Sequence, residues 1–272
     1  MHRRYYAPFP RQDQALRCST DACLDRFLLT SLQFLYGIDD AKCVRVEHKF
    51  MQVPYQYKRL WLIRHGETYT PARDAHALRE HEVVLSTAGV RQIEALAEQL
   101  QDIAFDAIYA SGMTRTLQTA QLIANRHCLP VLQEPDLQEM PLATAHGATL
   151  RDVSMAYIDI CRQLAVASPD EVMLPGPISV GALCRRYVAA IHRIMQPPAV
   201  KQALVVAHGG VNRLLMCTFL GLPYTHLLRF EQDNGCVNMI DFVKRGRPYV
   251  RLINHTTTDP WKTASPFRPP FR

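Results

Sequence analysis

The 272-residue chain contains no long apolar stretch, no Cys-x-x-Cys motif and no low-complexity run in its middle. The best candidate for a membrane segment, Phe27–Leu35, is far too short to span a bilayer, which takes about 20 residues. The eight cysteines show no spacing typical of a disulfide framework, so we expect reduced, buried thiols in a cytoplasmic protein. These absences argue against a membrane protein, a disulfide-rich secreted domain and a disordered chain.

The sequence also lacks the groupings of side chains that hold metal ions or nucleic acids. It has no cluster of carboxylates and no close spacing of His and Cys, so we expect no metal and no cofactor. The formal net charge of +6 is modest, and no basic stripe interleaved with aromatic residues is evident. We therefore expect no nucleic-acid partner, whereas a modest positive charge suits an anionic substrate.

The chain does contain a regular alternation of short apolar runs and amphipathic segments. Leu60–Ile63 and Ala203–Ala207 are continuous apolar runs, which are typical of strands buried on both faces. Apolar residues recur at helical spacing in residues 90–100 and 183–194. This alternation predicts an α/β three-layer sandwich, with a mainly parallel sheet and helices on both faces.

The first of these strands ends in Arg64, His65 and Gly66. In open α/β folds, ligands bind at the carboxyl ends of the parallel strands, so these residues occupy a favourable position for chemistry. An imidazole beside a permanently charged guanidinium is suited to attacking, or holding, an anionic group such as a phosphoryl. Gly66 would let the backbone pass close to a ligand.

Compatible pieces follow in order along the chain. A second pair, His208 and Gly209, follows the second apolar strand, and two such pairs are hard to attribute to chance among 11 histidines. Between them, Arg115 falls in the first turn of a predicted helix, where free backbone N–H groups attract anions. Glu139, in a proline-bounded loop, is a candidate proton donor to a leaving oxygen.

Taken together, these motifs resemble the signature segments of the histidine phosphatase superfamily, the phosphoglycerate-mutase-like proteins. The resemblance runs from about Arg59 to Asn254 and so covers most of the chain. The segments that carry it are Leu62–Thr68, Leu85–Gln92, Ser111–Ala120, Leu137–Met140 and Ala207–Arg213.

The resemblance implies a metal-independent phosphatase that hydrolyses a small phosphorylated metabolite through a phosphohistidine intermediate. His65 would attack the phosphorus, and Glu139 would protonate the departing oxygen and then activate water. The other implied residues would hold the transferring phosphoryl group. They are Arg64, Arg115 and His208, with Thr68 and the Gly209 backbone as weaker candidates.

Around this set of residues the sequence departs from the family pattern. Pro71 stands where many members carry a phosphate-binding asparagine, and residues 79–82 replace a Gly-x-x-Asp segment. Beyond the acid/base glutamate the chain reads Ala145–Leu150 in place of an aromatic-acidic-glycine pattern. Pro175–Ser179 stands in place of Pro-Gly-Gly-Glu-Ser. The residues expected to contact the substrate are therefore rewritten, and the sequence does not name the substrate.

Two alternative functions stay open. A phosphoglycerate-type mutase would keep the phosphohistidine and return the phosphoryl group to its substrate. The compact stretch between Glu139 and His208 favours hydrolysis, since the family's mutases commonly hold a longer, more basic insertion there. A catalytically silent binding or regulatory relative is the other alternative, and retention of the histidines, arginines and glutamate argues against it.

The resemblance divides the chain into three parts. Residues 58–255 form the predicted catalytic domain, which ends in a pair of strands at 236–243 and 249–254. Residues 1–57 form a partly helical N-terminal extension, whose apolar side would pack on the catalytic domain, on a second subunit in a homodimer or over the pocket. Residues 256–272 form a proline-rich tail.

Overall fold

The computed structural model of the chain describes residues 57–69, 83–142, 150–243, 247–260 and 262. All of them belong to one unit of the chain, Gln56–Arg272. The helix expected in the N-terminal extension lies outside the described residues. The same is true of most positions at which the sequence departs from the family pattern.

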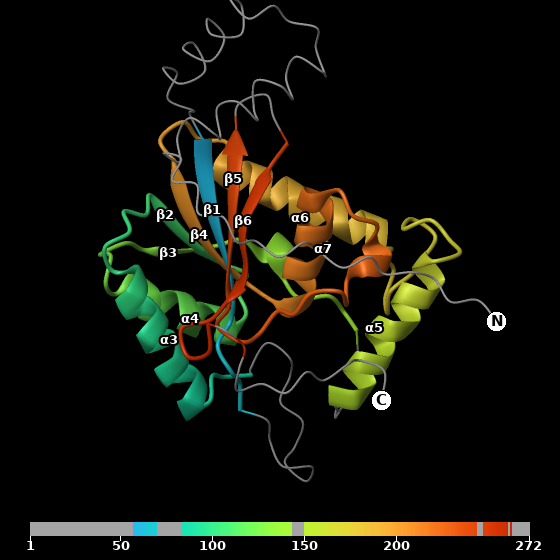
Figure 1. Cartoon of the computed structure of the whole chain (residues 1–272), viewed down its shortest axis with the longest axis horizontal. Coiled ribbons are helices and arrows are strands. Elements are labelled where there is room, and N and C mark those ends of the chain that lie inside the picture. The colour runs from blue at the N-terminus through green and yellow to red at the C-terminus, as the bar shows by residue number, and fades with distance from the viewer. Residues whose placement is uncertain (1–56, 70–82, 143–149, 244–246, 261, 263–272) are drawn as a thin grey trace, which may run out of the picture. The chain divides into compact units, whose positions relative to one another are not determined.

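Six strands form one sheet in the order β3-β2-β4-β1-β5-β6 (Figure 1). Their bounds are Tyr57–Arg64 for β1, Ala107–Ala110 for β2, Val131–Gln133 for β3, Gln202–Ala207 for β4, Val237–Val243 for β5 and Tyr249–His255 for β6. The first four strands pair in parallel, whereas β5 and β6 are added antiparallel at one edge. The mainly parallel sheet and the terminal strand pair are thus confirmed.

The helices alternate with the parallel strands along the chain. Their bounds are Thr87–Leu100 for α3, Thr114–Ala124 for α4, Leu150–Leu164 for α5, Val180–Met195 for α6 and Gly209–Leu220 for α7, with short 3₁₀ turns η2 at Pro135–Leu137 and η3 at Tyr224–His226. Ser86 and Ser179 cap α3 and α6 by accepting hydrogen bonds from backbone N–H groups of the first turn. Among the helices that the structure describes, none combines the length and apolar character needed to cross a membrane.

The sheet is covered on both faces, and β1 shows why its sequence is continuously apolar. Helices α6 and α7 cover one face of the sheet, and α3 and α4 cover the other (Figure 1). Leu60 and Leu62 pack in the core on the side of α6 and α7, whereas Trp61 and Ile63 pack in the core on the side of α3 and α4. Successive side chains of a strand alternate between faces, so a strand with two covered faces needs an apolar residue at every position. The predicted three-layer α/β sandwich is confirmed.

The pairing of β1 with β4 determines where the functional residues meet. The two strands are parallel, and Arg64 is paired with Ala207 at their carboxyl ends. The backbone N–H of His65 donates to the Ala207 carbonyl at 3.1 Å, so the chain leaves both strands at the same level. His65 and His208 therefore lie directly after the carboxyl ends of these two strands. Strand β2, on the other side of β4, leads into α4 at the same end of the sheet.

Candidate active site

His65 follows β1 and is only 6% exposed. Its Nδ1 lies 2.8 Å from the carbonyl oxygen of Gly66. Because a carbonyl oxygen can only accept, Nδ1 carries the proton and Nε2 is the unprotonated nitrogen. Burial and the charges of Arg64 and Arg115 lower the pKa of His65 well below its ordinary value of 6.5, so the ring is neutral at neutral pH. A neutral imidazole with an unprotonated Nε2 can act as a nucleophile.

His208 lies beside this ring, with the two ring centroids 5.4 Å apart. His208 Nε2 is 2.7 Å from Ser111 Oγ, which is 3.0 Å from Thr116 Oγ1. Thr116 donates its hydroxyl proton to the Met113 carbonyl at 2.7 Å, so it accepts from Ser111. Ser111 then accepts from His208, which places the proton on Nε2. His208 Nδ1 is buried and, within the described residues, has no hydrogen-bond partner.

Arg64 and Arg115 bring two guanidinium groups to these histidines. Arg64 is the last residue of β1, and Arg115 is the second residue of α4, as the sequence predicts. After burial, the charges of both arginines also lower the pKa of His208. Arg64 Nε is buried with no partner among the residues that the structure describes, and an unpaired buried donor costs about 1–3 kcal/mol. An oxyanion would satisfy such a donor with a charge-assisted hydrogen bond.

Glu139 reaches the same place from the loop after η2. Its Oε1 accepts hydrogen bonds from the backbone N–H groups of Met140 at 2.9 Å and of Gly210, in the first turn of α7, at 3.1 Å. Burial raises the pKa of Glu139, although these hydrogen bonds and the two nearby guanidinium groups act in the opposite direction. A carboxyl group that keeps its proton to higher pH than usual is suited to act as a general acid.

Gly209 begins α7 and lies against the guanidinium of Arg64. A Cβ atom at this position would be 3.4 Å from Arg64 Nε and 3.1 Å from Arg213 Nη1. The structure thus brings the predicted Gly209 next to one of the predicted phosphoryl-binding arginines. It also brings a second guanidinium, that of Arg213, to the same side of the glycine.

Gly210 is required for the approach of Glu139. A Cβ atom at Gly210 would lie 2.5 Å from Glu139 Oε1 and 2.6 Å from the hydroxyl oxygen of Tyr157, which no side chain could tolerate without a shift. Tyr157 comes from α5, and burial followed by the charge of Glu139 raises the pKa of its phenol. The Tyr157 hydroxyl and the Glu139 carboxyl group are therefore close neighbours, and both remain protonated more readily than in water.

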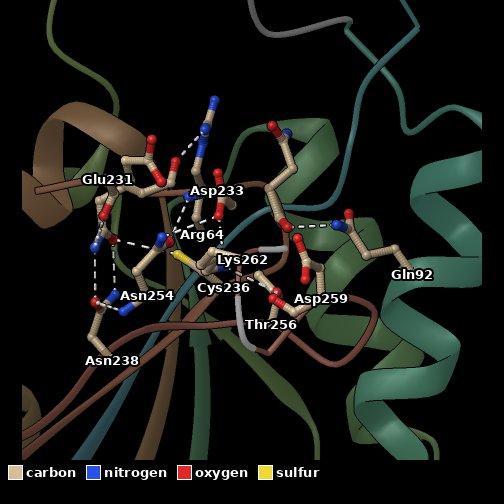
Figure 2. A network of polar contacts seen from close by, with 12 residues as sticks. Arg64, Gln92, Glu231, Asp233, Cys236, Asn238, Asn254, Thr256, Asp259 and Lys262 are labelled. Carbon is tan, nitrogen blue, oxygen red and sulfur yellow. Dashed lines mark hydrogen bonds and ion pairs between the residues drawn. The ribbon is translucent and has the colours of Figure 1, made fainter. Parts of the chain in front are cut away.

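A polar network holds Arg64 from the side of residues 231–236, which we call the anchoring loop (Figure 2). Arg64 Nη1 donates to the main-chain carbonyl oxygen of Gln232 at 2.5 Å. The side chains of Gln232 and Asn238 form a reciprocal amide pair, with both N···O distances 2.8 Å. Asn212 Nδ2, on α7, donates to the side-chain oxygen of Gln232, Oε1, at 3.0 Å. The network therefore ties the Arg64 guanidinium to β5 and to the helix that follows His208.

The anchoring loop also contacts the backbone around His65. Asn234 Nδ2 donates at 3.1 Å to the Gly66 carbonyl, the same oxygen that accepts the His65 Nδ1 proton. Lys262 Nζ donates to Asp233 Oδ2 at 2.6 Å (Figure 2). The beginning of the predicted proline-rich tail is thus attached to the loop that supports the site.

Thr68 is not joined to the other predicted residues. It forms a single antiparallel bridge with Leu85 and is half-buried. Its hydroxyl makes no hydrogen bond to any residue of the described ranges. A search of those same ranges finds no group of three or more His, Cys, Asp or Glu side chains that could hold a metal ion.

The model of the histidine phosphatase superfamily, branch 1, matches residues 60–256. This chain therefore belongs to the histidine phosphatase superfamily. The match runs from the middle of β1 to the end of β6, and it includes the histidines, arginines and glutamate described above.

Similar proteins include phosphatases and a mutase-like protein. The adenosylcobalamin/alpha-ribazole phosphatase of Escherichia coli K12 is 29% identical over 200 residues, which cover 72% of this chain and 95% of that protein. The probable phosphoglycerate mutase GpmB of Proteus mirabilis is 28% identical over 185 residues, or 68% and 85% of the two chains. The crystal structure of the alpha-ribazole phosphatase from Shigella flexneri matches with a TM-score of 0.57 and 28% identity, covering 72% of this chain and 96% of that one. These similarities support phosphatase or mutase chemistry and leave the substrate unnamed.

The sequence motifs assign no role to several residues that contact the site. Arg213 is the last residue of the segment Ala207–Arg213, and its spacing of four from Gly209 places both on one side of α7. Ser111 begins the segment Ser111–Ala120, but its hydrogen bond to His208 joins residues 97 positions apart. Tyr157 and Gln232 carry no local signal, because only the packing of α5 and the path of the anchoring loop bring them near.

We expect the Ser111→Ala substitution to release the tautomer of His208. Without Ser111 Oγ, the Nε2–H group loses its acceptor, and the neutral ring can carry its proton on either nitrogen. Nitrogen-15 NMR of histidine-labelled protein should show Nε2–H in the wild type and a mixture in the variant. Thr116→Ser keeps the chain of hydroxyl groups and should give the wild-type signal. An unchanged Nε2–H signal in Ser111→Ala would contradict the assignment.

The two buried histidines predict a loss of stability in mild acid. Their pKa values are lowered in the folded protein, so as pH falls below 6.5 the unfolded chain takes up protons that the folded chain does not. The free energy of unfolding should then fall by about 1.4 kcal/mol per pH unit for each histidine, until the folded-state pKa is reached. Urea unfolding over this range measures the slope. His65→Gln should remove one histidine's share, and a slope that stays the same would count against this explanation.

Proposed function

We propose that this protein is a metal-independent cytoplasmic phosphatase that hydrolyses a small phosphorylated metabolite through a phosphohistidine on His65. The main support is a neutral imidazole with an unprotonated Nε2, placed among two guanidinium groups and a second histidine, beside a carboxyl group of raised pKa. Such an arrangement offers a nucleophile, a cationic seat for the phosphoryl oxygens and a proton donor.

In the first step, His65 Nε2 forms a bond to phosphorus while the ester P–O bond breaks. The leaving oxygen takes the proton of Glu139, and the His65 Nδ1 proton stays on Nδ1, where it is donated to the Gly66 carbonyl in a hydrogen bond. Arg64 and Arg115 neutralise the charge on the transferring phosphoryl oxygens. This is the electrostatic role that a metal ion has in other phosphoryl-transfer enzymes, so the proposal needs no metal.

In the second step, water takes the place of the leaving group. Glu139, now a carboxylate, removes a proton from the water molecule whose oxygen attacks the phosphorus. The P–N bond breaks, inorganic phosphate departs, and His65 returns to its neutral form. Glu139 is then protonated again and ready for the next substrate.

The second candidate function is a phosphoglycerate-type mutase, which the similarity to the probable phosphoglycerate mutase GpmB favours. It shares the first step but returns the phosphoryl group to a substrate hydroxyl instead of to water. A catalytically silent binding relative is the third reading, and it would form no phosphohistidine.

We expect phosphate release from a panel of sugar phosphates, phosphoglycerates, nucleotides and p-nitrophenyl phosphate, unchanged by EDTA. His65→Ala should lower that rate more than ~10³-fold, because it removes the nucleophile. His192→Ala, an exposed histidine on α6, is the matched control and should keep full activity. Interconversion of phosphoglycerates without net phosphate release would identify the mutase. If no compound is turned over and none forms a phosphohistidine, the protein is the catalytically silent binding relative.

Glu139→Gln should separate substrates by their leaving group. Alkyl phosphates need a proton donor and should slow by ~10²–10⁴-fold, whereas p-nitrophenyl phosphate, with a good leaving group, should change far less. Glu98→Gln, on the exposed side of α3, serves as the control and should alter neither rate. Equal losses on both kinds of substrate would remove Glu139 from the role of general acid.

A further inference from the structure

A pocket of about 600 Å³ opens beside Glu139. Its walls come from the N-cap of α4, the loop that carries Glu139, and α6 with the residues before it. The lining residues are Met113, Gln138, Glu139, Pro141, Ile178, Leu183 and Arg186. The pocket wall thus combines four apolar side chains with Gln138 and with two charged residues, Glu139 and Arg186. Its volume is typical of sites for small molecules.

Glu139 connects this pocket to the residues proposed to carry the reaction. The Glu139 carboxyl group accepts a hydrogen bond from Gly210 in the first turn of α7, and the same residue forms part of the pocket wall. A general acid must be within hydrogen-bond reach of the oxygen that departs. The organic group attached to that oxygen then extends into the space that Glu139 lines. On the proposed function, the pocket therefore receives the leaving group of the phosphomonoester.

Arg186 reaches the pocket from the second turn of α6 without an acidic partner. Within the described ranges, its buried Nε has no hydrogen-bond partner and no carboxylate forms an ion pair with it. The other arginines of α6 differ. Arg185 pairs with Asp170 at 2.8 Å, and Arg193 pairs with Asp136 at 2.6 Å. A half-buried guanidinium with an unpaired donor, in the wall of a pocket, is suited to bind an oxyanion.

One hydrogen bond joins the helix that carries Arg186 to the loop that carries Glu139. The hydroxyl of Tyr187 donates to the Gln138 carbonyl at 2.8 Å, and Tyr187 is fully buried. Tyr187 follows Arg186 in the chain, and Gln138 precedes Glu139. The Arg186 guanidinium also lies 5.5 Å from the centroid of the Tyr187 ring, a cation–π contact. The helix that carries Arg186 and the loop that carries Glu139 are therefore joined to each other beside the pocket.

We propose that Arg186 binds an oxyanion on the leaving group of the substrate. The preferred substrates are then phosphomonoesters whose alcohol carries an apolar body and a second anionic group, either a carboxylate or a phosphate. This inference rests on the proposed phosphatase activity and adds to it the chemical class of the substrate.

The test compares aryl phosphates that differ only in the para substituent: 4-carboxyphenyl, 4-phosphonophenyl and the uncharged 4-carbamoylphenyl phosphate. We expect the wild-type kcat/KM for at least one anionic compound to exceed that for the carbamoyl compound by ~10–100-fold, the usual effect of a hydrogen bond to a charged group. The carboxylate and phosphonate compounds show which oxyanion Arg186 prefers. Arg186→Met should bring the ratio close to one, because the loss of kcat/KM falls on the anionic compounds.

Arg185→Met is the matched control, because it removes the same charge from the next position on α6 but from an exposed side chain paired with Asp170. It should keep the wild-type ratio, and Arg186→Lys should keep part of it. Equal rates for anionic and neutral compounds in the wild type would overturn the proposal, even if the Arg186 variants fail to fold. A loss in Arg186→Met that is the same for all three compounds would also overturn it, since a purely structural role predicts that result. Absence of His65-dependent hydrolysis of every compound would instead contradict the proposed function.

Discussion

The parallel pairing of β1 with β4 is the constraint on which the site depends. Arg64 and Ala207 are paired residues at the carboxyl ends of these strands, so the histidine that follows each of them lies at the same end of the sheet. A shift of one residue in this register would move every side chain of β1 to the opposite face. Both faces of β1 are packed, so the core that stabilises the sheet also determines the separation of His65 and His208.

Burial gives the site its electrostatic character. Two guanidinium groups lie beside two histidines whose pKa values are lowered. The imidazole rings therefore stay neutral, and the positive charge of this group of residues comes from the arginines. Arg64 Nε and His208 Nδ1 are buried and lack partners among the described residues. A phosphoryl group can satisfy the arginine donor, and its charge compensates the arginines. In the same surroundings Glu139 has a raised pKa, so one environment favours an unprotonated nucleophile and a protonated acid.

Two hydrogen-bonded supports outside the proposed catalytic residues keep this arrangement in place. The anchoring loop holds the Arg64 guanidinium through Gln232, whose amide pairs with that of Asn238 (Figure 2). Tyr187 holds the loop of Glu139 to α6 through its bond to the Gln138 carbonyl. Each support is buried and hydrogen-bonded, and a buried polar group that loses its partner is costly. Small displacements of the arginine or the acid are therefore opposed by the core itself.

The sequence by itself determined the layered α/β fold, the strand ends with their His-Gly pairs, Arg115 in the first turn of its helix and Glu139 in its loop. These features are local, since each consists of a strand or helix and the few residues after it. It did not indicate β3, which is three residues long and partly exposed, so its apolar pattern is too short to recognise. It also indicated no anion-binding role for Arg186, which has the same residue type as its exposed neighbour Arg185.

Only the tertiary structure decided which partners the site residues have. Ser111 meets His208 across 97 positions, and Arg64 meets the Gln232 carbonyl across 168. Tyr157 reaches Glu139 only because α5 packs where it does. Local sequence patterns report which way a side chain faces on its own strand or helix, whereas these contacts depend on how separate elements pack together. That packing is set by the whole core, and no single segment of the sequence contains it.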